Sequence, residues 1–298
     1  MRIDAHQHFW RFEPAEYPWM SADMQVLRRD WMPSDLRPLL EQQRLDACIA
    51  VQARTSESET DFLLTLATQH AWIAGVVGWI DLRADVAARL ERWQDDPKLV
   101  GLRHPIQDEA DVDAWVNDRA FAQGLADLQR HRLAYDVLVY EHQLPSILHL
   151  CARADDHWLV LDHLGKPAIR DRDHARWREL IAPLAKMPHI ACKLSGLVTE
   201  ALDARGEFDA DALRIYLDSA LELFGPERLM FGSDWPVCLL AAPYARVAAI
   251  IESWSAHLSP ADREALWGGT AARVYALPGM YASNPLHRDI PAAGVRKR

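Results

Sequence analysis

The first residues that could do chemistry are two histidines in the segment MRIDAHQHFW, His6 and His8, which lie two positions apart. If the segment is a β-strand, both side chains point the same way, and Asp4 belongs to that face as well. Two imidazoles on one strand can bind a single metal ion where the strand end curves. A histidine can also cap a strand or bond to a loop, so the spacing alone leaves a ligand pair and a structural pair as alternatives.

Two later segments carry residues of the same kind. In LDHLGKP, Asp162 and His163 are adjacent and would face opposite ways on a strand. We expect His163 to face the site, with Asp162 outside it or bonded behind it. A core histidine with a satisfied N–H is the alternative. In MFGSDWP, Asp234 follows an apolar run, where a carboxylate can bind a metal ion, take a proton from water, or simply cap the next helix.

Candidate substrate contacts come from three further segments. Arg103 and His104 in GLRHP could polarise a carbonyl oxygen of a substrate, and a salt bridge within the fold is the alternative. Gln52 ends another apolar run. Lys166 could reach a substrate oxygen, although the ordinary interpretation is a solvated loop lysine.

The elements that must position these residues repeat along the chain. Apolar, β-branched runs typical of strands lie near residues 2–9, 47–53, 73–80, 99–106, 132–140, 157–165, 189–196 and 229–236. Helical patterns lie between them, as in DADALRIYLDSALELFG, where apolar residues recur at helical spacing. This alternation predicts one (β/α)₈ barrel domain over residues 1–298. A doubly wound sheet is less well supported, because its glycine-rich fingerprint is missing.

Such a barrel carries its active site at the carboxyl ends of the strands, where the candidate residues fall. The stretch 9–35 after the first run is long and contains Trp10, Trp19 and Trp31. We expect this loop to close over an apolar face of the substrate, with Trp31 contacting it. The same tryptophans could instead pack the loop onto the barrel. Residues 278–298 form a tail with no predicted role.

Composition narrows the class of partner and the compartment. The formal net charge of −10 argues against nucleic acid and anionic membranes as partners. The four cysteines form no CxxC pair and indicate reduced thiols. No apolar segment at the N-terminus indicates a signal peptide, and no stretch approaches the roughly 20 apolar residues of a membrane span. We therefore predict a cytoplasmic protein, and a homo-oligomer is compatible with the sequence.

Together, the segments IDAHQHFW, LDHLGKP, FGSDWP and GGTAARVYAL resemble the amidohydrolase superfamily, in the same order and over residues 1 to about 277. The segments DAHQHFW and FGSDWPVC are similar to those of one branch of this superfamily, the small lactone hydrolases. That branch includes sugar lactonases of the L-fuconolactonase and L-rhamnonolactonase type, and relatives acting on muconolactone-type and pyrone lactones.

The resemblance implies a role for each matching residue. The motif histidines map onto His6 and His8, the histidine of strand six onto His163, and the aspartate of strand eight onto Asp234. That aspartate would activate the hydrolytic water, with or without one divalent ion. The sequence has LRHP and DVLVY where two-metal members carry a bridging lysine and a further histidine, so a two-metal site is not expected.

The sequence therefore predicts a lactonase that opens a 1,4- or 1,5-lactone of a sugar, such as L-fuconolactone, to the aldonic acid. Asp234 and His163 would be catalytic, and His6, His8 and Asp234 would hold one divalent ion, with zinc as the first choice. Metal-free catalysis stays open. A metal-dependent decarboxylase on the same fold and a sugar-acid binding protein without turnover are the alternative functions.

Overall fold

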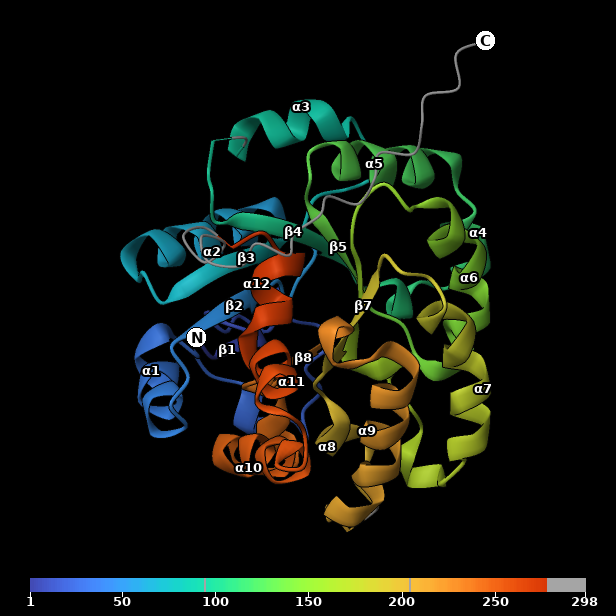
Figure 1. Cartoon of the computed structure of the whole chain (residues 1–298). Coiled ribbons are helices and arrows are strands. Elements are labelled where there is room, and N and C mark those ends of the chain that lie inside the picture. Colours follow the sequence, from blue (N-terminus) through green and yellow to red (C-terminus); the bar gives the residue numbers. More distant parts are fainter. Residues whose placement is uncertain (94, 204, 278–298) are drawn as a thin grey trace.

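The computed structural model describes residues 1–93, 95–203 and 205–277 (Figure 1). Within them, eight parallel strands form one sheet in chain order: β1 Ile3–Gln7, β2 Ala47–Val51, β3 Ile73–Gly78, β4 Leu99–His104, β5 Ala134–Val137, β6 Leu159–Leu161, β7 Ile190–Leu194 and β8 Leu229–Phe231. Backbone bonds join the two ends of the sheet, from Asp234 N to His6 O (2.8 Å) and from His8 N to Trp235 O (2.7 Å). The predicted barrel is confirmed, and each strand lies within its predicted run.

Helices surround this ring of strands on the outside, and the last of them lies across one end of the ring (Figure 1). They are α1 Pro33–Gln42, α2 Glu57–Gln69, α3 Val86–Leu90, α4 Val112–Val116, α5 Arg119–Arg130, α6 Leu144–Arg153, α7 His174–Ala185, α8 Leu197–Glu200, α9 Ala210–Phe224, α10 Tyr244–Ser255, α11 Pro260–Glu264 and α12 Thr270–Val274. Local sequence sets their ends. In α9, the Asp209 carboxylate accepts a bond from Asp211 N (3.0 Å), and Gly225 follows the last turn at φ 71°.

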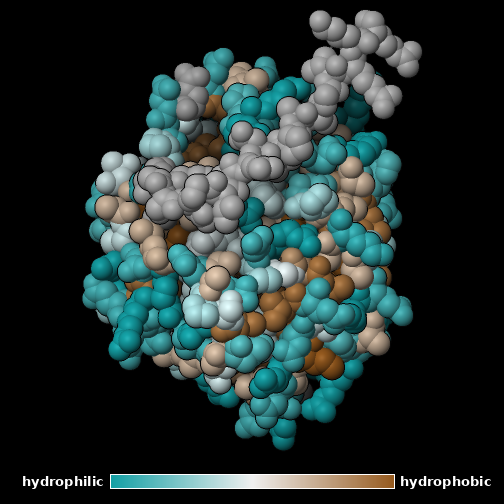
Figure 2. Space-filling model, in the orientation of Figure 1, coloured by the Kyte–Doolittle hydropathy of each residue, from teal (hydrophilic) through white to brown (hydrophobic). Residues whose placement is uncertain are grey.

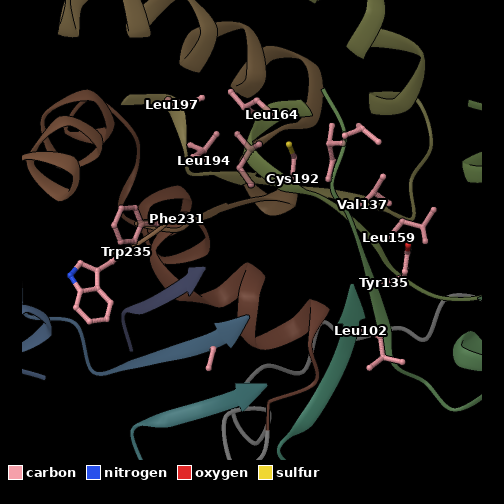
Figure 3. Close-up of a cluster of buried hydrophobic side chains, with 14 of the residues drawn as sticks. Leu102, Tyr135, Val137, Leu159, Leu164, Cys192, Leu194, Leu197, Phe231 and Trp235 are labelled. Atoms are coloured by element: carbon pink, nitrogen blue, oxygen red, sulfur yellow. The ribbon is translucent and has the colours of Figure 1, made fainter. Parts of the chain in front are cut away.

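The apolar core has two layers, one on each side of the strands. Side chains on the outer side, such as Leu102, Val137 and Phe231, pack toward the helices (Figure 3). Mostly alanine, valine and isoleucine side chains fill the inside of the barrel, together with Met230 of β8 and with Tyr275 and Leu277, which follow α12. This segment closes one end of the barrel and leaves the other end to the loops that follow the strands.

Strand β1 is irregular between Asp4 and Gln7, where its register against β2 shifts. Because of this shift, Asp4 does not share a face with His6, which corrects the expectation from spacing. The Asp4 carboxylate accepts bonds from Tyr244 Oη of the outer helix α10 (2.9 Å) and from Ser233 Oγ (2.6 Å). A bulge of this kind redirects side chains near a functional site.

The aromatic loop is shorter than predicted, because α1 already begins at Pro33. Its backbone pairs Trp10 with Trp31 (3.0 and 2.9 Å), and Trp19 Nε1 donates to the Ala53 carbonyl (2.9 Å). Trp10 therefore holds the two ends of the loop together, and Trp19 fastens the loop to the residues that follow β2. The predicted tail 278–298 lies outside the described residues, and the single domain over 1–298 stays a prediction.

Hydrophilic side chains cover most of the face that Figure 2 shows, with hydrophobic ones in patches between them. In the part of the chain that the structure describes, no helix has both the length and the apolar character to cross a bilayer. All four cysteines are buried free thiols.

Candidate active site

Three imidazoles surround one carboxylate where β8 meets β1, at the carboxyl end of the barrel. Asp234 Oδ1 lies 3.3 Å from His8 Nε2 and 3.7 Å from His6 Nε2. The ring of His163 lies 4.5 Å from that of His6, centroid to centroid. The structure thus brings together all four residues that the sequence singled out as catalytic or metal-binding, and each is buried.

The hydrogen bonds of His8 set the chemistry of this cluster. Its Nδ1 lies 2.8 Å from the Val51 carbonyl, which can only accept, so Nδ1 carries the proton and Nε2 of the neutral ring is bare. That bare nitrogen faces Asp234 Oδ1 and also lies 3.3 Å from His6 Nε2. Acceptors that face one another are stabilised by a proton or a cation placed between them.

These donors fit a metal ion. Ligand atoms at the corners of a tetrahedron with Zn–N and Zn–O bonds of about 2.0–2.1 Å lie about 3.3 Å apart. The separations among His6, His8 and Asp234 are 3.3, 3.3 and 3.7 Å. His163 also offers a nitrogen, since ligand atoms of His6, His163 and Asp234 lie within 4.8 Å of one another.

Left-handed backbone positions the residues after β6 and β8. His163 has φ 55° and Asp234 has φ 57°, a conformation that is strained for residues other than glycine. The turn at His163 brings both Asp162 and His163 to the barrel interior. The expectation that these neighbours face opposite ways is therefore wrong, because it assumed that β6 continues as a strand.

Burial and charge determine the protonation of the cluster. Burial lowers the pKa of His6 well below its usual value and that of His163 to about 4, so both rings are neutral near pH 7. Burial alone would raise the pKa of Asp234, but His163, His8 and His6 outweigh it and hold this pKa below its usual value. Asp234 is therefore a buried anion beside the neutral rings of His6 and His163, which also suits a cation.

Arg103 lies inside the barrel beside His6, but its N–H groups are all engaged. Nε and Nη2 donate to Gln52 Oε1 (2.9 and 2.7 Å), and Nη2 also donates to the Gln52 carbonyl. Nη1 donates to Asp162 Oδ2 (2.9 Å) and faces His6 Nε2 (3.3 Å). Gln52 and Arg103, both predicted to bind substrate, thus hold each other and offer no free guanidinium donor in this arrangement.

His104 does not join the cluster. It lies on the opposite face of β4, where its ring stacks on Trp115 at 4.3 Å. Trp79 Nε1 donates to its Nδ1 (3.0 Å), and its Nε2 lies 2.7 Å from Glu109 Oε1. The strand alternation that turns Arg103 inward turns His104 outward, so this position does not favour the predicted contact with substrate.

Lys166 and Trp31 lie near the cluster. The Lys166 ammonium lies 4.9 Å from the centre of the Tyr140 ring, and its charge helps to lower the pKa of His163, whose main cause is burial. The Trp31 ring packs against that of Trp235, the residue after Asp234, at 5.0 Å. The position of Lys166 suits the rim of a substrate site, whereas Trp31 is 8% exposed and the Arg29 guanidinium lies over its ring, 3.4 Å from the ring centre.

Three interior residues at strand ends received no role from the sequence. Ser195 Oγ lies 2.8 Å from His163 Nδ1. Lys193 Nζ pairs with Asp136 Oδ2 and lies 3.2 Å from His6 Nδ1. The sequence does contain a signal for two of them. Asp136 and Lys193 each lie two residues after an alanine that faces the barrel interior, Ala134 and Ala191, and alternate residues of a strand share a face.

Comparison with known proteins identifies the class. The amidohydrolase family model matches residues 3–277, so the chain belongs to this family, as the resemblance implied. The chain is 58% identical over 287 residues to L-fucono-1,5-lactonase of Burkholderia multivorans, covering 93% of this chain and 97% of that protein. L-fucono-1,5-lactonase of Burkholderia ambifaria is 35% identical, covering 92% of this chain and 95% of that protein.

A solved relative agrees with the fold. The crystal structure of an amidohydrolase from Burkholderia multivorans with bound zinc is 58% identical and superimposes with a TM-score of 0.90. The match covers 93% of this chain and 100% of that one. Zinc is thus bound by a relative whose fold this chain shares.

Proposed function

We propose that this protein hydrolyses a sugar lactone to its aldonic acid, with L-fucono-1,5-lactone as the first candidate substrate. The enzyme class predicted from the sequence is confirmed by the two Burkholderia relatives: the chain is a lactonase of the amidohydrolase family. The observation that carries the proposal is the convergence of His6, His8 and His163 on Asp234 in a chain so similar to a named lactonase.

In the proposed reaction a water molecule attacks the ring carbonyl and Asp234 takes its proton. The carbon–oxygen bond of the ring then breaks, and the same proton passes from Asp234 to the departing ring oxygen, which becomes a hydroxyl group. The lowered pKa of Asp234 keeps it ionised and able to accept a proton. Ser195 would hold the His163 ring in place through Nδ1.

We also propose that His6, His8 and Asp234 hold one divalent ion, with zinc as the first choice. The support is the acceptor geometry of these three residues and the zinc bound in the related crystal structure. When bound, such an ion would supply Lewis-acid polarisation of the carbonyl or of water.

The rim of the site is proposed to contact the sugar. Lys166 would donate to a hydroxyl oxygen, and Trp31 would lie against an apolar face of the ring.

The four free thiols support a reducing compartment, and we propose a cytoplasmic enzyme of carbohydrate metabolism.

A pH-indicator assay with a panel of sugar lactones tests this function. We expect acid release from L-fucono-1,5-lactone, and slower release from lactones of different stereochemistry. If no lactone of the panel releases acid, the proposal is wrong. Release of carbon dioxide from a carboxylated substrate as the main activity would favour the decarboxylase, and tight binding of sugar acids without turnover would favour a binding protein.

A further inference from the structure

A network of buried charged and polar residues lies beside His6, and the proposed hydrolysis assigns it no step. It comprises Arg103 of β4, Asp136 of β5, Asp162 after β6, Lys193 of β7 and Tyr275 after α12, here called the buried polar network. Each of these residues is at most 5% exposed. Two carboxylates balance two cations, so the network needs no charge on His6 to be neutral. Buried ion pairs contribute little net stability, because the cost of desolvation offsets their attraction, so stability alone does not account for this network.

The network crosses the barrel from its closed end to the site. Tyr275 Oη donates to Asp136 Oδ1 (2.6 Å), and the Lys193 ammonium donates to Asp136 Oδ2. Lys193 Nζ also lies 3.1 Å from Asp162 Oδ1. Hydrogen bonds and an ion pair therefore connect the segment that closes the barrel to the Asp162 carboxylate.

Arg103 determines which nitrogen of His6 is bare. Its Nη1 donates to Asp162 Oδ2 (2.9 Å) and faces His6 Nε2 at 3.3 Å. A guanidinium group is planar and has donors only, so an N–H of Arg103 can meet a bare Nε2 but not an Nε2–H. The neutral His6 ring then carries its proton on Nδ1.

The acceptor beside that proton is Asp162 Oδ1, a buried oxygen that has no hydrogen-bond partner among the described residues. His6 Nδ1 lies 3.2 Å from Asp162 Oδ1 and 3.2 Å from Lys193 Nζ. The ammonium hydrogens can turn toward the two carboxylates, which leaves Nδ1–H free to donate to Asp162. The other tautomer would set two donors against each other at Nε2 and leave Asp162 Oδ1 without the imidazole donor.

We propose that Asp162 is a positioning residue that holds His6 as its Nδ1–H tautomer, with the Nε2 lone pair facing Asp234 and His8. Arg103 Nη1 faces the same lone pair, so a proton of water or a cation at the centre of the cluster would take the place of Arg103 as its partner. Carboxylates behind histidine ligands fix ring tautomer and orientation in this way. The consequence for turnover rests on the proposed hydrolase function, whereas the tautomer does not.

Nitrogen-15 NMR of the full chain, labelled at histidine and held at neutral pH without added metal, tests the proposal. Loss of one signal in His6→Gln assigns the ring. We expect the wild type to carry the His6 proton on Nδ1. In Asp162→Asn, Arg103 keeps the amide oxygen, so the amide NH₂ faces His6 Nδ1, and we expect the proton to move to Nε2. Glu59→Gln is the matched control, because Glu59 is equally buried and does not contact His6.

A merely structural role would lower the stability of Asp162→Asn but leave the His6 tautomer unchanged. We expect kcat to fall about 10- to 100-fold in this variant, with a smaller change in KM. A wild-type ring protonated on Nε2, or an Asp162→Asn protein that keeps Nδ1–H, overturns the proposal. If that variant does not fold, the wild-type spectrum still decides between the tautomers. The spectra need no substrate, so a failed lactone assay would overturn the proposed function alone.

Discussion

The two halves of the barrel interior differ sharply although the same strands line both. In the half closed by α12, β5 and β7 contribute Ala134 and Ala191, which pack with Leu277. Two residues further along, the same strands contribute Asp136 and Lys193. A single step of strand alternation thus separates packing from chemistry. Substitutions in the apolar half should change stability, and those in the polar half should change turnover.

The largest effect is expected at the polar end, for Asp234→Asn. The amide keeps the shape of the side chain but cannot take a proton from water, so we expect kcat to fall by roughly 10²–10⁴-fold. Thermal unfolding should change little by comparison. Lactone hydrolysis and a thermal melt of the same sample measure both, and a kcat within tenfold of the wild type would contradict the role of Asp234.

The converse is expected at the closed end, for Leu277→Ala. Leu277 is 1% exposed and packs inside the barrel, so its truncation leaves a cavity. We expect the free energy of unfolding to fall by about 2–5 kcal/mol, with kcat of the folded protein nearly unchanged. Urea unfolding and initial rates test this. Ile215→Ala is the control, because Ile215 is 50% exposed and should cost much less. A large loss of kcat in the folded variant would mean that the two halves are not separable.

The free energy of unfolding should depend differently on pH in the wild type and in His163→Gln, whose amide can still bond to Ser195. The pKa of His163 is about 4 in the folded protein, against 6.5 for the ordinary side chain. Between these values the unfolded chain binds the proton and the folded one does not, so the wild type loses stability as pH falls. From pH 7 to pH 4 it should lose about 3 kcal/mol relative to the variant, at 1.36 kcal/mol per pKa unit. Urea unfolding at several pH values measures this, and a difference that does not change with pH would contradict it.

The positions of the strands and of the polar residues at their ends could be predicted from sequence. Apolar runs that repeat at regular intervals mark the strands, and a polar residue at the end of each run marks the strand end. The direction of particular side chains could not. The register shift in β1 moved Asp4 to the outside, and the left-handed turn at His163 brought Asp162 inward. Both depend on local backbone that alternation does not encode. The pairing of Lys193 with Asp136 was equally hidden, because it depends on which strands face each other across the barrel.

The smallest effect expected is a gain in stability from added zinc. Whether a variant keeps this gain should depend on which end of the barrel carries its substitution. An ion that binds only the folded protein stabilises it by about 2.7 kcal/mol at 100 times its dissociation constant. We expect zinc to raise the melting temperature of the wild type and, equally, that of Leu277→Ala, whose metal-binding residues are intact. His8→Ala should lose the shift, because its Nε2 lies 3.3 Å from both His6 Nε2 and Asp234 Oδ1. Thermal melts with and without zinc measure the shift, and an equal shift in His8→Ala would place the zinc elsewhere on the molecule.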